Sequence, residues 1–196
     1  MNISNFKNKK LCAIKCALVV IVLIFLLFIS GYFTLRKVIY PLKYIDIITK
    51  EASKNNIDPY LLLSVVKIES NFNPNATSNK GAKGLMQMIY STALEVNQKL
   101  KIYDTISEDE LYDVDFNLTI GADYLGMLIK RYNGNYYLAI CAYNAGLGNV
   151  DKWIENGIVS ENLDDYNEND IPFNETKRYL KNVIKTYKMY KILYWL

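Results

Sequence analysis

The longest run of hydrophobic positions lies near the start of the chain. Residues 16–35 contain no charged side chain. An α-helix needs about 20 predominantly apolar residues to cross the hydrocarbon core of a bilayer, so this run predicts a transmembrane helix. A cleaved signal peptide, the alternative, would end its apolar core in small residues. Only Ser30 and Gly31 are small here, and the pattern therefore favours an uncleaved anchor.

Beyond this run, apolar positions recur at helical spacing. The first such segment covers residues 42–54. Asp58 followed by Pro59 is typical of a helix start, because Asp accepts hydrogen bonds at the N-cap and Pro fits the first helical position. The buried face of that helix is expected to consist of Leu61, Leu62, Val65, Val66 and Ile68. Residues 71–87 are rich in Asn, Ser, Gly and Pro, so a loop is expected there.

Two helices are expected in the middle of the chain. Ser91 is a candidate N-cap for a helix that ends near Leu100. Ser107 and Glu110 have the spacing of a capping box. A longer helix follows them, and residues 133–134, Asn-Gly, are expected to end it.

The last third of the chain predicts two more helices. Residues 136–145 form a short apolar helix, closed by Gly146 and Gly148. Residues 156–170 are polar and indicate a surface segment, after which Asn174 is the expected cap of a final helix to the carboxyl end. Strand-type alternation is absent from the sequence. The fold class predicted is therefore all-α, with a domain of about 150 residues that is large enough for its own core.

The patterning divides the chain into four parts. Residues 1–15 form a short basic tail, 16–35 the membrane anchor, 36–42 a short linker and 43–196 the globular domain. Four lysines precede the span, whereas two basic residues follow it closely. Such a bias keeps the preceding segment cytoplasmic, so a single-pass protein with an extracytoplasmic domain is expected.

Charge and composition exclude several classes of function. The formal charge is +3, but five cations precede residue 37, where no acid occurs, so the remainder carries about −2. No nucleic-acid partner is expected from such a domain. The chain has no histidine, and Cys141 is the only cysteine beyond the span. These facts argue against a zinc site, a Ser-His-Asp triad and a disulfide framework.

Three sequence blocks occur in order along the globular domain. The first comprises residues 69–74, ESNFNP, and 78–87, SNKGAKGLMQ. The second is 142–146, AYNAG, and the third is 171–180, IPFNETKRYL. Together they resemble the catalytic domain of the soluble lytic transglycosylase family, over most of the globular domain. The resemblance implies a lysozyme-like fold of the goose type and a bacterial cell-wall enzyme.

Glu69 is the candidate catalytic residue. It ends an otherwise apolar helix and precedes a loop that could form one wall of a cleft. A carboxyl held against apolar groups resists ionisation, so it keeps its proton near neutral pH as a general acid must. A lone glutamate at a helix end would more often be a solvated carboxylate. The loop in matching register favours the catalytic role.

The resemblance implies a reaction that uses one carboxyl, although glycosidases normally use two. Glu69 would protonate the oxygen between N-acetylmuramic acid and N-acetylglucosamine, and then accept the proton of the muramyl C6 hydroxyl as a 1,6-anhydro ring closes. The implied partner is the peptidoglycan glycan strand, and no metal or other cofactor is implied. The alternatives are a lysozyme-like muramidase, a non-catalytic peptidoglycan-binding protein on the same fold, and a transmembrane scaffold. Cell-wall or secretion machinery as a partner stays open.

The same resemblance implies a set of substrate-binding residues, namely Ser78, Gly84, Gln87, Tyr143, Asn144 and Glu175. Each has a structural alternative: a turn for the loop residues, core packing for the tyrosine and a helix-dipole role for Glu175. Three departures from the family pattern are Ile89 and Tyr90, where Met and Pro are usual, and Lys67-Ile68 before the acid. They bear on subsite preference more than on the reaction.

Overall fold

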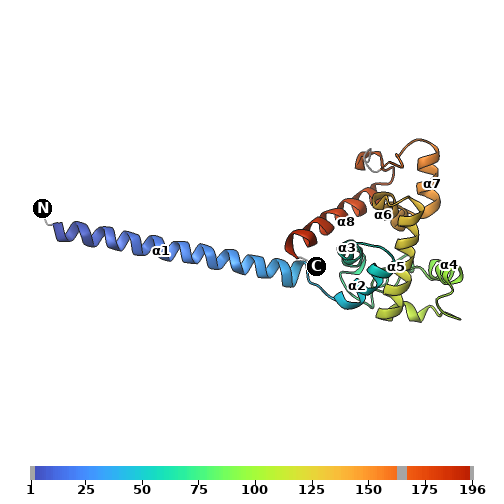
Figure 1. The fold of residues 1–196 in the computed structure, drawn as a ribbon, viewed down its shortest axis with the longest axis horizontal. Helices are drawn as coiled ribbons and strands as arrows, with labels where there is room; N and C mark the ends of the chain where they lie inside the picture. Colours follow the sequence, from blue (N-terminus) through green and yellow to red (C-terminus); the bar gives the residue numbers. More distant parts are fainter. Residues whose placement is uncertain (1–2, 163–166, 195–196) are drawn as a thin grey trace. The chain divides into compact units, whose positions relative to one another are not determined.

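The computed structural model describes residues 3–162 and 167–194, with side chains from Lys15 onward. The chain divides into two units, Met1–Leu42 and Lys43–Leu196. Figure 1 shows the long helix of the first unit and the clustered helices of the second.

The first unit is one long helix. α1 covers Ile3–Thr34 and leads directly into a π-helical turn, η1, over Leu35–Ile39. The segment Lys15–Ile39 is long and apolar enough to cross a membrane, and none of its most apolar stretch is buried inside the protein. The helix therefore continues beyond the predicted span. Its non-helical connection to the second unit consists of residues 40–44, a shift from the predicted 36–42.

The second unit is all-helical in the part of the chain that the structure describes. Its α-helices are α2 (Ile45–Lys54), α3 (Pro59–Ser70), α4 (Tyr90–Leu100), α5 (Val114–Arg131), α6 (Tyr136–Ala145), α7 (Leu147–Glu155) and α8 (Asn174–Leu193). Two 3-10 turns, η2 (Asp109–Tyr112) and η4 (Glu168–Asp170), lie between them. Strand-type pairing is limited, within the described residues, to isolated bridges in the loop after α3. The predicted all-α fold class is confirmed.

Short polar side chains set the starts of three helices. The Asp58 carboxylate accepts the backbone N–H of Tyr60 at 2.9 Å, with Pro59 in the first helical position, as the sequence predicts. Asp113 caps α5 in the same way through the N–H of Phe116, at 2.8 Å. Asn135 caps α6. These bonds satisfy N–H groups that have no partner within the helix.

Other predicted caps are wrong. α4 begins at Tyr90, so Ser91 lies inside its first turn, and the side chain of the N-cap residue Ile89 makes no capping bond. Asn174 is the first residue of α8 rather than its cap. Glu110 does accept the N–H of Ser107 at 2.6 Å, but this box closes the turn before η2 instead of starting the long helix. α7 has no counterpart among the predicted helices.

The core forms around α3. This helix packs against α2 and α8, while α5 packs against α2, α4 and α6. The predicted apolar face of α3 is buried, with Leu62, Val65 and Val66 at 0% exposure, although Ile68 is only partly covered. Tyr60 and Tyr190 stack across the α3–α8 interface, their ring centroids 6.3 Å apart.

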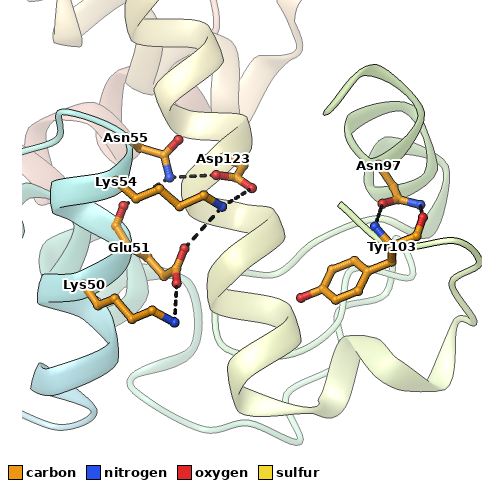
Figure 2. Close-up of polar contacts among 7 residues, drawn as sticks. All are labelled: Lys50, Glu51, Lys54, Asn55, Asn97, Tyr103 and Asp123. Atoms are coloured by element: carbon orange, nitrogen blue, oxygen red, sulfur yellow. Dashed lines mark hydrogen bonds and ion pairs between the residues drawn. The ribbon is translucent and has the colours of Figure 1, made fainter. Parts of the chain in front are cut away.

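Polar contacts join α2 to α5 (Figure 2). The buried Asp123 accepts hydrogen bonds from Lys54 Nζ at 3.1 Å and from Asn55 Nδ2 at 2.7 Å. Lys54 also lies 3.7 Å from Glu51, which is 2% exposed. Gly126 faces Asn55, and a Cβ at this position would come within 3.0 Å of its side chain. The missing side chain thus lets the two helices approach closely.

Candidate active site

Glu69 lies in the last turn of α3, where the helix meets the loop. Its Oε1 accepts a hydrogen bond of 2.6 Å from the hydroxyl of Tyr179, which comes from α8. Burial raises the pKa of the Glu69 carboxyl to about 7, and the hydrogen bond from Tyr179 opposes that rise. Burial also raises the pKa of the Tyr179 hydroxyl well above its usual range, so this group stays protonated and donates.

The loop after α3 supplies one wall of the site. Ser78 Oγ accepts the backbone N–H of Ala82 at 3.0 Å, which closes a tight turn. Gln87 has a positive φ of 49°, and its Nε2 donates to the carbonyls of Ala76 and Gly84, both at 3.1 Å. These hydrogen bonds within the loop define its local shape.

Gly84 lies behind this wall. Its φ is +77°, and a Cβ there would overlap the Leu111 carbonyl and the Asn117 side chain. Its backbone N–H donates to the Ala76 carbonyl at 2.9 Å. The structure thus supports the turn role that the sequence left as an alternative, while the predicted contact of Gly84 with substrate stays a prediction.

Asn117 attaches the loop to α5, a role that no feature of the sequence indicates. Its side chain is fully buried. The carboxamide accepts the N–H of Met86 at 2.7 Å and donates to the carbonyls of Lys83, at 3.0 Å, and Leu111, at 2.7 Å. Three backbone groups from two segments are satisfied by one amide, so the loop position depends on α5.

α6 contributes Tyr143 and Asn144. The Tyr143 hydroxyl donates to the Met86 carbonyl at 2.7 Å and lies 3.2 Å from Met88 Sδ. It therefore holds the loop, and Tyr179 rather than Tyr143 is the residue that donates to Glu69. Asn144 Oδ1 accepts a bond of 2.8 Å from the hydroxyl of Thr176 on α8.

The first turn of α8 supplies the opposite side. Glu175 is exposed, and its Oε1 lies 3.5 Å from Lys80 Nζ on the loop. Both side chains are largely solvated, so this ion pair contributes little to stability. It does join the two sides of the site across the opening.

Residues from α3, the loop after it, α6 and α8 line one cleft of about 300 Å³. Its lining residues are Glu69, Ser78, Asn79, Lys80, Ala82, Gln87, Ile89, Tyr143, Asn144 and Glu175. All of the predicted site residues except Gly84 are thus brought together, from three blocks of sequence. Ile89, 44% exposed, lines the cleft. Tyr90 is not among the lining residues, and its hydroxyl donates to the Ile106 carbonyl at 2.9 Å.

Sequence reasoning missed Tyr179 and Thr176 as site residues. Both lie within the third sequence block, but Tyr179 is one of several tyrosines along α8 and is 8% exposed. Its position one turn after Glu175 would have placed its hydroxyl near the cleft. The pattern alone could not distinguish this tyrosine from Tyr187 and Tyr190, which lie further along the same helix.

Comparison with known proteins indicates the family of this chain. The family model of the Transglycosylase SLT domain matches residues 46–164. The soluble lytic murein transglycosylase of Escherichia coli K12 is 33% identical over 145 residues, which cover 74% of this chain and 22% of that protein. The membrane-bound lytic murein transglycosylase C of Cronobacter sakazakii is 32% identical over 171 residues, 76% of this chain and 46% of that protein.

Solved structures share the fold. The 70 kDa soluble lytic transglycosylase of Escherichia coli superposes with a TM-score of 0.71 and 31% identity, over 78% of this chain and 24% of that one. An inactive glutamate-to-glutamine mutant of the Pseudomonas aeruginosa enzyme gives 0.70 and 32%, over 78% and 25%. The chain spans about a quarter of these soluble relatives. On this evidence it belongs to the Transglycosylase SLT domain family.

Proposed function

We propose that this chain is a peptidoglycan lytic transglycosylase that cleaves the β-1,4 bond between N-acetylmuramic acid and N-acetylglucosamine. The observation that carries the proposal is the Glu69 carboxyl, whose pKa is raised to about 7 and which lines the cleft. A group whose pKa lies near the working pH can both give and take a proton. Family membership and the names of the relatives support the same activity.

In the proposed reaction, neutral Glu69 donates its proton to the glycosidic oxygen as the bond from that oxygen to muramyl C1 breaks. The Glu69 carboxylate then accepts the proton of the C6 hydroxyl, and O6 forms a bond to C1. The proton returns to Glu69 and no water is consumed. One carboxyl serves both steps because burial favours its neutral form while Tyr179 stabilises the anion.

The other lining residues have binding roles in this proposal. Ser78 and Gln87 present polar groups from the loop, and Asn144 and Glu175 do so from the opposite side. Tyr143 keeps the loop in place through Met86. Binding energy from such contacts orients the bond to be cleaved against Glu69.

A lysozyme-like hydrolase is the second candidate, because a second carboxylate, Glu175, lines the same cleft. Hydrolysis by two carboxyls needs one that acts on water or on the sugar directly. Glu175 is solvated and paired with Lys80, which favours a binding role. The product decides between the two reactions.

We also propose that residues 16–35 anchor the enzyme in the bacterial cell membrane with residues 1–15 cytoplasmic. α1 contains a segment suited to crossing a bilayer. The lysines before the span favour this orientation. The catalytic domain, residues 43–196, would then act outside the cytoplasm on glycan strands.

Mass spectrometry of muropeptides released by the purified full-length chain in detergent tests the function. The wild type should release fragments that end in 1,6-anhydromuramic acid, each one water lighter than a hydrolysis product. Glu69→Gln should lose at least on the order of 10²-fold in rate, because each assisted proton transfer contributes ~10²- to 10⁴-fold. Gln keeps the shape and can still accept a hydrogen bond from Tyr179.

A matched control is Glu155→Gln, which makes the same chemical change at an exposed position on α7. It should cleave at the wild-type rate. Reducing muramyl ends would convert the assignment to hydrolase. A Glu69→Gln protein as active as this control would remove Glu69 from the mechanism, and a wild type that binds glycan without cleaving it would show a binding protein.

A further inference from the structure

The outward face of α8 is strongly basic. Six of the twenty residues of this helix are Lys or Arg, and one is acidic. Exposed basic residues recur every three or four positions at Arg178, Lys181, Lys185 and Lys188. Residues at that spacing share one side of a helix. The opposite side carries buried residues such as Leu180 and Val183, so the basic face points to solvent.

Most of this charge has no ion-pair partner in the part of the chain that the structure describes. Lys181 Nζ lies 3.5 Å from Glu168 Oε1. Arg178, Lys185 and Lys188 make no ion pair or hydrogen bond within residues 3–162 and 167–194. The domain as a whole carries slightly more acid than base, so these cations form a local positive surface on a nearly neutral body.

A hollow of about 420 Å³ lies along this face. Lys181, Lys185 and Lys188 line it together with the apolar side chains of Ile184 and Met189. Tyr137 of α6 and Glu168 complete the lining. One turn further on, Ile192 is 71% exposed. Cations beside accessible apolar groups suit a ligand with an anionic head and an apolar body.

We propose that the basic face of α8, defined as Arg178, Lys181, Lys185 and Lys188 with Ile184, Met189 and Ile192, docks on anionic phospholipid headgroups of the membrane that holds the anchor. Basic residues gain free energy near an anionic bilayer, and the apolar side chains can enter its interface. A water-soluble polyanion would use the charge and leave the apolar groups exposed.

Chain length makes the bilayer accessible to this face. If residues 16–35 span the membrane, η1 continues the helix to Ile39, and the five non-helical residues 40–44 reach at most ~18 Å at ~3.5 Å each. The globular domain is thus confined near the surface, where tethering raises the effective concentration of the lipid. The inference rests on the proposed span, but not on the catalytic activity.

Docking would have a consequence for the enzyme. The first turn of α8 lines the cleft through Glu175, and the basic face begins one turn later at Arg178. A helix that lies on the bilayer would therefore fix the distance of the cleft from the membrane. The glycan presented to Glu69 would be the layer beside the membrane.

The test places a reporter thiol, Asn182→Cys, on the exposed side of α8 in the full-length chain. The protein is incorporated in lipid nanodiscs of phosphatidylcholine, with or without phosphatidylglycerol, and an uncharged maleimide labels the thiol. Mass spectrometry follows that peptide separately from native cysteines. Each surface lysine strengthens attachment to an anionic bilayer about five-fold. Labelling should therefore slow on the order of 10-fold or more in the anionic discs.

Two matched variants separate docking from general charge effects. Replacement of Lys181, Lys185 and Lys188 by Gln should restore the fast rate. Replacement of Lys99, Lys101 and Lys152, three exposed lysines outside α8, by Gln should leave labelling slow in the anionic discs. A second reporter, Gln98→Cys on α4, should label equally fast in both lipids.

Equal rates at Asn182→Cys in the two lipids would overturn the proposal, as would slow labelling that survives the triple Gln change on α8. Protection by soluble polyglycerol phosphate without protection by phosphatidylglycerol would assign the face to an anionic wall polymer instead. The labelling reaction contains no glycan. The labelling rates therefore do not depend on whether the chain cleaves peptidoglycan, and a failure of the catalytic proposal would leave them unchanged.

Discussion

Burial of the Glu69 carboxyl has a consequence for stability as well as for catalysis. The pKa of this group rises from 4.5 to about 7 on folding. A raised carboxyl pKa means that the folded state holds the proton more tightly than the unfolded chain. Below pH 4.5 both states are protonated, and the group has no net effect. As the pH rises through 7, the folded protein bears the full cost of a buried carboxylate.

Glu69→Gln should therefore stabilise the protein in a pH-dependent way. Near pH 4.5 the variant and the wild type should unfold alike. By pH 8 the free energy of unfolding of the variant should exceed that of the wild type by up to about 3 kcal/mol, since each pKa unit corresponds to ~1.4 kcal/mol. Urea unfolding at the two pH values, with Glu155→Gln as the control for lost charge, measures this difference. A gain of the same size at both pH values would contradict the raised pKa.

Two tyrosines in the site should respond differently to loss of the hydroxyl. Tyr179→Phe removes the bond that favours the Glu69 anion, so the pKa of Glu69 should rise and the alkaline limb of the pH–rate profile should move to higher pH. Tyr143→Phe removes the donor to the Met86 carbonyl. That change should destabilise the fold by ~1–3 kcal/mol, the cost of a buried unsatisfied group. It should leave the alkaline limb of the pH–rate profile unchanged.

Initial rates on peptidoglycan from pH 5 to 9, together with thermal unfolding, separate the two roles. Loss of one aligned donor in a catalytic site typically costs ~10²-fold or more in rate, so Tyr179→Phe should be slow. Tyr143→Phe should also be slow, because the loop that this hydroxyl holds lines the cleft. If Tyr179→Phe leaves the pH–rate profile of the wild type unchanged, its hydroxyl does not set the pKa of Glu69. If only Tyr143→Phe shifts the profile, the two assignments are exchanged.

At the level of elements, local sequence determines some helices and tertiary packing determines others. α3 and α6 follow the sequence pattern closely because each begins at a strong polar cap, Asp58 or Asn135, and carries a continuous apolar run. α7 was not expected, because Gly146 and Gly148 suggested that the helical region had ended. Gly146, with a φ of 88°, does end α6, but the chain begins a new helix at once. Burial of Val150 and Trp153 then stabilises it.

The active-site loop shows what the sequence could not supply. Its composition predicts a loop, and the motif identifies Ser78 and Gln87, but the position of the loop depends on Asn117, more than 30 residues away. An asparagine inside a helical segment carries no mark of such a partner. The same holds for Tyr179, since only the packing of α8 against α3 brings its hydroxyl to Glu69.

At the scale of the whole molecule, the sequence predicts two parts, one suited to the lipid bilayer and one suited to water. One is an apolar helix with no protein cover, and the other is a helical domain with its own core. The boundary between the two units falls after Leu42. In the proposed function, the anchor would limit which glycan the cleft can reach.

The length of the connection should therefore determine which wall material is cut. A flexible insert of about 30 Gly and Ser residues between Leu42 and Lys43 adds a mean reach of ~30 Å. In cells whose peptidoglycan has been pulse-labelled, the native enzyme should release mostly newly inserted glycan, on the assumption that new material lies nearest the membrane. The lengthened enzyme should release a larger share of older glycan.

The control carries the same insert before residue 15, on the side of the span proposed to be cytoplasmic, where it adds mass without adding reach. It should behave as the native enzyme does. If the lengthened and native enzymes release label of the same age, the tether is only an anchor and the wall itself limits access. The insert and the triple Gln change on α8 each free the cleft from the membrane surface. If the insert changes the age of the released glycan and the triple Gln change adds to that effect, reach and docking act together.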